Sequence, residues 1–327
     1  MLAIRQYEFG GPEVLVPEAV DDLTPGPGQV RIAVAAAGVH VIDTSIRSGR
    51  SAGPFPLPDL PMTPGREVAG RVDLLGEGVD PEWSGRRVVA HLGQANGGYA
   101  EQAVAPMDAL HVVPDGLTDD AAVALIGTGR TTMGVWEVAD VVPGDVVIIT
   151  AAAGGIGSNL VQLAHHVGAT VVGLAGGPAK VIQVQALGAD IALDYLEVDW
   201  PTQVQRTLDG RGGSVLFDSV GGPITADAIS LLGDRARVVT FGWSSGDSTP
   251  PDEDTLSARS ITRTVPIGPA MMQRPGGLRG LEDEAMAAAA DGVLAPLVNA
   301  PFALVDAASA HRALESRHTI GKVVLTP

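Results

Sequence analysis

The chain has 327 residues, 45% of them hydrophobic and 18% charged, a length that favours two domains and a composition typical of globular proteins. The absence of cysteine excludes disulfides, thiolate nucleophiles and every cysteine-based zinc site. The formal net charge is -17 and the 21 Lys and Arg residues are scattered, so we expect no nucleic acid as the main ligand. No stretch reaches the ~20 apolar residues of a membrane-spanning helix, and the first residues do not resemble a signal peptide, so we expect no membrane partner and a cytoplasmic location.

The first hundred residues are rich in Gly and Pro and hold short β-type runs at Val30–Ala36, Val68–Leu74 and Arg87–Ala90. This pattern predicts a compact β-rich domain. At Thr118 the pattern changes to a capped helix start that continues through Ala121–Leu125, so we expect a second domain to begin about there.

From Asp145 onward, short apolar runs alternate with helical stretches. This alternation predicts an α/β domain with a parallel, doubly wound sheet. We predict its strands at Val146–Thr150, Thr170–Leu174, Ser214–Phe217, Arg237–Phe241 and Ile261–Ile267, and its first helices at Ile156–Val167 and Ala179–Leu187. An Ala-rich helix follows at Leu281–Ala290, and a β-type run at Lys322–Leu325 is predicted to return to the first domain.

The segment between the first predicted strand and helix is the most informative part of the chain. It reads Ala151-Ala152-Ala153-Gly154-Gly155-Ile156-Gly157, with Ala152, Gly154 and Gly157 at the spacing of a dinucleotide-binding loop. Free amides at the start of the helix would point at a pyrophosphate. The alternative is a glycine-rich turn that only packs the helix on the strand.

The end of the next predicted strand bears on the choice of nicotinamide cofactor. An NAD site usually has Asp or Glu there, bonded to the ribose 2′-hydroxyl. Here Ala175 and Gly176 stand at the strand end and Lys180 follows, so we predict NADPH as the cofactor, with Lys180 pairing its 2′-phosphate. The alternative for Lys180 is a solvated residue in the first turn of a helix.

Several motifs, in order, resemble the zinc-independent quinone oxidoreductase family of the medium-chain dehydrogenase/reductase superfamily, over nearly the whole chain. They are Ala36–Thr44, Arg47–Gly49, Pro64–Gly70, Gly97–Glu101, Ala151–Gly157, Phe217–Gly221, Phe241–Gly242 with Ser244–Gly246, and Gly321–Lys322.

The resemblance implies a GroES-like β-barrel catalytic domain at residues 1–120, completed by 270–327, and a Rossmann NADPH-binding domain at 121–269. It also implies an active site in the cleft between the domains and a homodimer joined through Ile261–Ile267. The cofactor contacts we expect are Thr131, Ala152, Gly154, Gly155, Ile156, Gly157, Gly176, Lys180, Tyr195, Ser219, Phe241, Trp243 and Ser244. Packing at a strand end is an equal alternative for Tyr195, and Trp243 is either a cleft wall or a packing residue. The segment Met271–Gly277 is either a mobile lid or a plain surface loop.

Zinc-dependent relatives in this superfamily bind the catalytic metal through a Cys and through a His in a Gly-His-Glu motif. Here those places carry His40 and Arg66, and a guanidinium cannot ligate zinc. We therefore predict no metal. Without a Lewis acid, reduction of an electron-poor acceptor is favoured over alcohol oxidation.

The substrate end departs from bacterial quinone reductases, which carry Asn at the place of His40 and Tyr at that of Ser45. A carbonyl oxygen that gains charge needs a hydrogen-bond donor, and His40, Ser45 and Arg47 are the candidates. Our hypothesis is that His40 orients or protonates this oxygen and that Asp43 fixes its tautomer. The alternative is a histidine that only lines the cleft.

These observations predict an NADPH-dependent reductase of a quinone or an α,β-unsaturated carbonyl compound, a small molecule. An enoyl-thioester reductase acting on acyl-CoA or carrier-bound chains and a non-catalytic NADPH-binding protein remain as alternatives.

Overall fold

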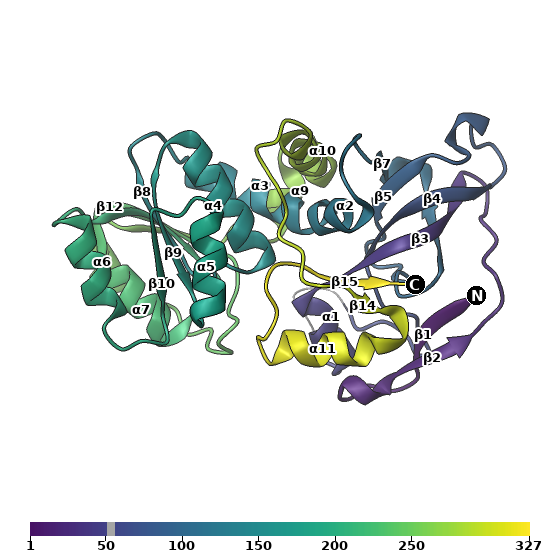
Figure 1. Ribbon diagram of the computed structural model, residues 1–327, viewed down its shortest axis with the longest axis horizontal. Coiled ribbons are helices and arrows are strands. Elements are labelled where there is room, and N and C mark those ends of the chain that lie inside the picture. Colours follow the sequence, from purple (N-terminus) through teal and green to yellow (C-terminus); the bar gives the residue numbers. More distant parts are fainter. Residues whose placement is uncertain (51–55) are drawn as a thin grey trace. The chain divides into compact units, whose positions relative to one another are not determined.

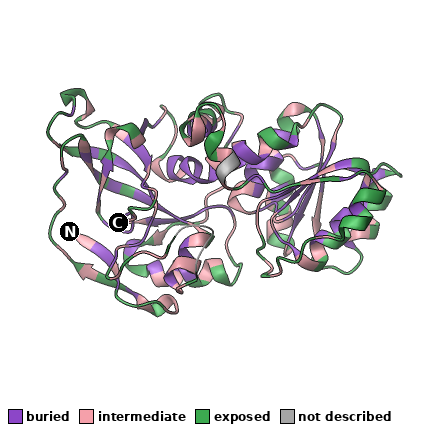
Figure 2. Ribbon diagram, turned by 180° about the vertical axis from the view of Figure 1, so that it is seen from behind, coloured by how far each residue is buried: buried purple, intermediate pink, exposed green. Residues whose placement is uncertain are grey.

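The computed structural model describes residues 1–50 and 56–327, with the side chains of all of these except 269 and 270. The chain divides into two compact units (Figure 1). Unit 1 consists of Met1–Thr128 and Pro296–Pro327, and unit 2 of Gly129–Ala295. In Figure 2 the strands of both units are largely buried, whereas the exposed residues lie mainly on helices and loops.

Unit 1 is built on a mainly antiparallel sheet in the order β14-β15-β3-β4-β5-β7, with β6 paired to β3. A separate antiparallel pair is formed by β1 and β2. The strands are β1 (Leu2–Gln6), β2 (Leu15–Ala19), β3 (Gln29–Val39), β4 (Glu67–Leu75), β5 (Arg87–His91), β6 (Gln102–Pro106), β7 (Leu110–Val112), β14 (Phe302–Ala303) and β15 (Val323–Thr326), and the helices are α1 (Val41–Arg47), α2 (Asp119–Ile126) and α11 (Ala307–Glu315).

The long strand β3 organises this unit because it pairs with β4, β6 and β15. Its inward residues Val30, Ile32 and Val34 join a core to which β15 adds Val323 and Leu325. The predicted return of the chain to the first domain is therefore observed. The pairings among the described residues form an open path from β14 to β7, so the predicted closed barrel is not confirmed.

Unit 2 contains a parallel sheet in the order β10-β9-β8-β11-β12-β13, as the alternation of strands and helices predicts. Its strands are β8 (Val146–Ile149), β9 (Thr170–Ala175), β10 (Ile191–Asp194), β11 (Gly213–Asp218), β12 (Leu232–Thr240) and β13 (Thr262–Thr264). Its helices are α3 (Thr128–Ala139), α4 (Gly155–Val167), α5 (Pro178–Ala186), α6 (Trp200–Leu208), α7 (Gly222–Ser230), α8 (Glu253–Ala258), α9 (Pro269–Gln273) and α10 (Gly277–Ala290).

The strand order of unit 2 reverses between β8 and β11. From β8 the chain steps outward to β9 and β10, and from β11 it steps the other way to β12 and β13. Because such crossovers are right-handed, α4 and α5 cover one face and α6 and α7 the other, as Figure 1 shows. A reversal of this kind opens a crevice at the carboxyl ends of the two central strands, where ligands bind in open α/β sheets.

The bounds of the compact units differ from those of the predicted domains at two places. Helix α2 lies in unit 1, where Ala122–Ile126 are buried. Residues 270–295 lie in unit 2, because α9 and α10 are tied to α3. Arg130 pairs with Glu282 at 3.0 Å, and Arg274 pairs with Glu137 at 2.9 Å. The segment Met271–Gly277, predicted as a loop, begins inside α9.

Candidate active site

The loop after β8 places a helix start directly against a strand end. The Ala152 amide donates to the Leu174 carbonyl oxygen at 2.9 Å, and α4 begins with Gly154 as its N-cap. A Cβ atom on Gly157 would lie 2.4 Å from the Ala151 oxygen and 2.8 Å from the Ala152 Cα atom. Only glycine fits there, and the close approach leaves the first amides of α4 at the loop for an anion.

A buried carboxylate supports the neighbouring loop after β11. Oδ1 of Asp218 accepts hydrogen bonds from the hydroxyls of Thr150 at 3.0 Å and Thr225 at 2.7 Å, and from the Val220 amide at 3.2 Å. The Thr150 hydroxyl in turn accepts from the Ser219 amide at 3.0 Å. The ends of β8 and β11 are therefore locked together at the point where the strand order reverses.

The other predicted cofactor residues of unit 2 follow the carboxyl ends of its strands, apart from Thr131 on α3. Gly176 follows β9, and a Cβ on it would lie 3.1 Å from the Tyr195 ring, so this ring packs against the Gly176 backbone. The Ser244 amide donates to the Ser219 oxygen at 2.9 Å, and Trp243, which is 40% exposed, packs beside Gly221. The predicted cofactor residues other than Thr131 thus lie along one edge of the parallel sheet. They are Ala152, Gly154, Gly155, Ile156, Gly157, Gly176, Lys180, Tyr195, Ser219, Phe241, Trp243 and Ser244.

In unit 1, the predicted donor His40 belongs to a buried group of charges. Its Nε2 atom lies 2.7 Å from Oε2 of Glu67, and Nζ of Lys322 lies 2.5 Å from Oε1 of the same carboxylate. Glu67 is fully buried, Lys322 is 5% exposed, and the side chain of His40 is 21% exposed. Nε2 faces Glu67, and the His40 side chain also meets the backbone amide of Asp43 in a capping box at the start of α1.

The backbone makes room for this carboxylate. A Cβ atom on Gly38 would lie 2.0 Å from Oε1 of Glu67, and one on Gly127 would lie 2.4 Å from Oε2. Although burial alone would raise the pKa of Glu67, the charges of His40 and Lys322 outweigh it and hold this pKa well below its ordinary value. Glu67 is therefore ionised.

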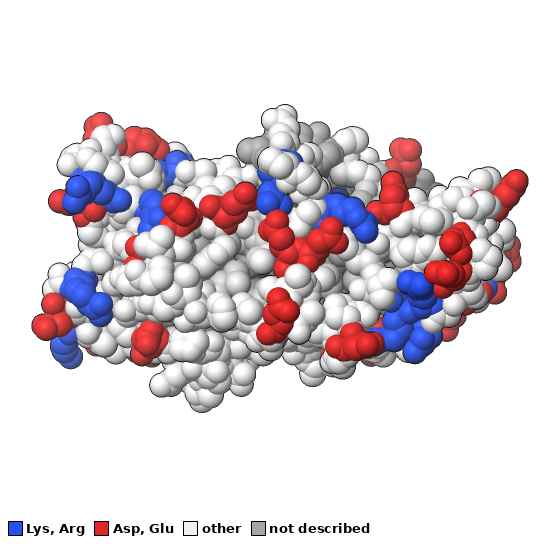
Figure 3. Space-filling view, turned by 90° about the horizontal axis from the view of Figure 1, so that it is seen from above, with Lys and Arg blue, Asp and Glu red and all other residues white. Residues whose placement is uncertain are grey.

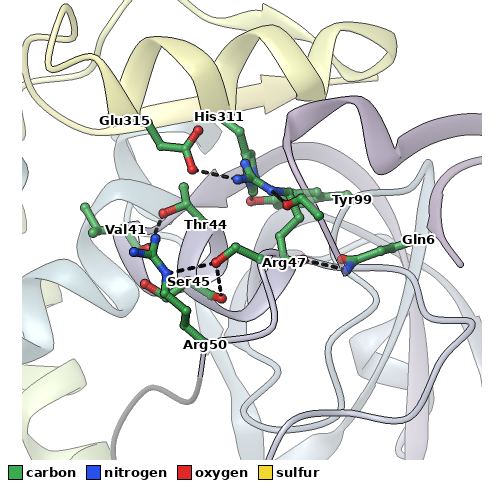
Figure 4. Close-up of polar contacts among 11 residues, drawn as sticks. Gln6, Val41, Thr44, Ser45, Arg47, Arg50, Tyr99, His311 and Glu315 are labelled. Atoms are coloured by element: carbon green, nitrogen blue, oxygen red, sulfur yellow. Dashed lines mark hydrogen bonds and ion pairs between the residues drawn. The ribbon is translucent and has the colours of Figure 1, made fainter. Parts of the chain in front are cut away.

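A second buried network lies between α1 and α11 (Figure 4). The Tyr99 hydroxyl lies 3.1 Å from Oδ2 of Asp43 and 3.1 Å from Nε2 of His311. The Arg47 guanidinium donates to the Gly10 carbonyl at 3.1 Å, to Nδ1 of His311 at 3.2 Å and to Glu315 at 2.6 Å.

The donor capacities of these groups fix the direction of the hydrogen bonds. Arg47 can only donate, so Nδ1 of His311 accepts, Nε2 carries the proton and donates to Tyr99, and Tyr99 donates to Asp43. Burial and the Arg47 charge lower the pKa of His311 to about 3, which keeps the ring neutral. Burial and the Asp43 carboxylate raise the pKa of Tyr99, which keeps the phenol protonated.

Two of the predicted catalytic residues therefore need a correction. The carboxylate of Asp43 accepts from the His40 backbone amide at 2.8 Å, and it is the Asp43 backbone amide that meets the His40 side chain in the capping box of α1. Arg47 is 3% exposed and its guanidinium is used within unit 1, so we reassign it from substrate donor to structural residue. Glu67 is the residue whose carboxylate faces the His40 ring.

Beside α1 lies a small pocket whose lining includes Ile42, Ile46, Leu57, Arg66 and Asn96. The pocket is shallow: about 330 Å³ lies outside the protein atoms when open solvent is included, but the cavity itself is only about 10 Å³. Arg66 precedes β4 directly, so its side chain and that of the buried Glu67 leave the strand on opposite sides. Ser45 lies on α1 and is half-buried.

The charged groups around His40 are already paired with one another. Within residues 1–50 and 56–327, no group of three His, Asp or Glu side chains is placed to hold one. Both oxygens of Glu67 already face positively charged or proton-donating partners, and the buried Lys322 ammonium would repel a dication at this carboxylate.

Comparison with known proteins decides the family. Residues 26–115 match the alcohol dehydrogenase GroES-like domain, and residues 155–273 match the zinc-binding dehydrogenase family. A quinone oxidoreductase of Pseudomonas aeruginosa is 32% identical over 99% of this chain and 99% of its own length. The chain belongs to the quinone oxidoreductase family of the medium-chain dehydrogenase/reductase superfamily.

Other members of this family support the same assignment. A 2-haloacrylate reductase of Burkholderia is 33% identical over 100% of this chain and 99% of its own length. The crystal structure of the Escherichia coli quinone oxidoreductase complexed with NADPH has a TM-score of 0.87 and 30% identity, and the match covers 100% of both chains. The family and the two-domain α/β architecture expected from the sequence are thus confirmed.

Sequence analysis missed the roles of Tyr99, His311 and Lys322. Tyr99 and Lys322 stand in motifs that carried the resemblance, yet nothing in those motifs pairs Lys322 with Glu67. His311 has no local motif at all and reaches the site only because α11 packs on α1.

Proposed function

We propose that the protein is an NADPH-dependent reductase that delivers hydride to a quinone or another conjugated carbonyl acceptor, without zinc. The observation that carries this proposal is the glycine-fitted helix start in unit 2, and the histidine that faces Glu67 in unit 1 supports it separately. The names of the relatives agree with it, since they include quinone oxidoreductases and a reductase of a conjugated acid.

The nucleotide side rests on residues at the edge of the parallel sheet. The amides at Gly155–Gly157 would bind the pyrophosphate, and the Cβ-free surface of Gly157 is what brings them to the loop. Lys180, in the first turn of α5, would pair the 2′-phosphate beside Tyr195. The strand β9 ends at Ala175 and is followed by Gly176, so no carboxylate stands there to repel this phosphate.

The acceptor side rests on His40. NADPH, when bound, supplies the two electrons and one proton of a hydride and leaves as NADP⁺. His40 supplies the second proton to the acceptor oxygen, which gives a hydroquinone or an enol and balances the reaction. The carboxylate of Glu67 faces the His40 ring, and Lys322 holds Glu67 in place.

Zinc independence is supported by the positive charges of Arg66 and Lys322. Both side chains are cations, and a cation repels a zinc ion instead of binding it. The proposal also includes the homodimer. Strand β13 stands at the end of the sheet order, and Val265 and Ile267 just beyond it are 42% and 45% exposed. The unpaired edge of a terminal strand is a surface on which a second sheet can pair, and these two apolar side chains would be covered beside it.

The experiment is a panel of quinones and enones assayed for oxidation of NADPH and of NADH, with calorimetric binding of both dinucleotides. We expect NADPH to bind more tightly and to be oxidised by at least one acceptor class. Binding of NADPH without turnover of any acceptor would leave the non-catalytic alternative, and no binding of either dinucleotide would exclude the proposal.

A further inference from the structure

The pocket beside α1 contains a cation that the proposed reaction does not use. Its walls are mainly apolar, with Ile42 and Ile46 one helical turn apart on α1 and Leu57 from the following segment. Among the described residues that line it, Arg66 is the one with a charged side chain. An apolar pocket with a single fixed charge is the usual form of a small-molecule site.

The orientation of Arg66 is set by the protein. Its Nε atom donates to the Gly93 carbonyl oxygen at 3.1 Å, which is the one hydrogen bond of this guanidinium within the described part of the chain. The two terminal nitrogens are therefore not committed to a described acceptor. They present the planar pair of donors that matches a carboxylate.

The charge of the pocket contrasts with that of the protein. The chain carries a net charge of -17, and on the face in Figure 3 basic side chains lie among acidic ones. At ordinary salt the effect of distant acidic groups is screened over ~10 Å. The charge that acts on a molecule in the pocket is therefore that of the Arg66 guanidinium, which touches it. A neutral group would leave the partly buried cation without compensation, whereas an anion would pair it.

We infer that Arg66 binds a carboxylate group of the acceptor, and that the protein prefers conjugated carbonyl compounds carrying a carboxylate over their neutral analogues. This inference rests on the proposed function. It names the substrate class within it: a short unsaturated keto acid or quinone acid whose anionic end lies at Arg66. The apolar walls from Ile42 and Ile46 would contact the carbon chain.

The test compares 4-oxopent-2-enoate with its methyl ester, as acceptors for NADPH oxidation by the wild type and by Arg66→Gln. We expect the variant to lose ~10-fold or more in kcat/KM for the acid and little for the ester, as a lost charge-assisted hydrogen bond predicts. Arg71→Gln is the matched control, because Arg71 lies on β4, the strand that follows Arg66, is exposed and also donates to a backbone carbonyl. An equal change for acid and ester would overturn the inference.

Two further measurements separate the possible failures. Arg66→Lys keeps the charge and should keep part of the preference for the acid, which also covers the case in which the Gln variant does not fold. Calorimetry with saturated 4-oxopentanoate reports binding without turnover. Arg66-dependent binding with no turnover of any acceptor would reject the proposed function and retain the carboxylate site. Turnover without any dependence on Arg66 would retain the proposed function and reject the carboxylate site.

Discussion

The Nε2 atom of His40 lies 2.7 Å from Oε2 of Glu67, so a buried carboxylate holds the ring that the proposed reaction uses as its proton donor. We therefore expect His40→Ala to lower kcat by ~100-fold, the lower end of the effect of a general acid, with the affinity for NADPH unchanged. Steady-state kinetics at saturating acceptor would measure this, and His166→Ala, exposed on α4, is the control. An unchanged kcat would remove His40 from the chemistry.

The pair of Glu67 and Lys322 should show strong coupling in stability. Lys322→Met leaves Glu67 with His40 alone, and Glu67→Gln leaves a buried ammonium without its partner. Each single change should cost about 3 kcal/mol or more of unfolding free energy, as the loss of one partner of a buried ion pair does. The double variant should cost clearly less than the sum. Denaturant titrations give these values, and additive losses would show that the two groups act independently.

Gly157 should tolerate no side chain. A Cβ there meets the Ala151 oxygen at 2.4 Å, so Gly157→Ala must displace the loop or the start of α4. We expect the dissociation constant of NADPH to rise by ~10-fold or more, measured by calorimetry. In Gly233→Ala, the added Cβ meets nothing closer than 3.7 Å and should leave binding unchanged. If both variants bind NADPH as the wild type does, the loop does not hold the pyrophosphate.

Lys180 should control the choice between the two dinucleotides. Lys180→Ala should weaken NADPH binding by ~10-fold and leave NADH binding unchanged, because only NADPH carries the 2′-phosphate. Fluorescence titration with both dinucleotides measures the ratio. Arg211→Ala, at the exposed turn after α6, is the control. A parallel loss for both dinucleotides would assign Lys180 to folding of α5 instead.

His311 should make stability depend on pH. Its pKa is lowered to about 3 in the folded protein, so between pH 6.5 and 4.5 the unfolded chain takes up a proton that the folded one does not. The free energy of unfolding should therefore decrease as the pH is lowered through this window. At pH 5 this residue should account for a decrease of about 2 kcal/mol relative to neutral pH. In His311→Asn this part of the decrease should be missing. Thermal unfolding of both proteins from pH 7 to 5 gives the difference, and parallel curves would contradict the burial of a neutral ring.

The strand, loop and helix around residues 151–157 could be predicted because they are local in sequence. The loop at 151–157 lies between its own strand and helix, so spacing alone indicated its shape. The charged group around His40 could not be predicted from the sequence, because Glu67 and Lys322 meet only when β15 pairs with β3. Asp43 was predicted to hold the His40 ring since both lie in one short segment, yet the helix start uses its carboxylate for the backbone. Arg47 was misassigned for a similar reason, since α11 brings His311 and Glu315 to it from far along the chain.

The pairing of β15 with β3 has a consequence for how the protein is made. Unit 2 is contiguous from Gly129 to Ala295, whereas unit 1 needs Pro296–Pro327 to complete its sheet. During synthesis Glu67 is made long before its partner Lys322. The segment synthesised first is therefore the one that finishes folding last. A nascent chain stalled before residue 296 should therefore bind dinucleotide through unit 2 while its amino-terminal part stays open to protease.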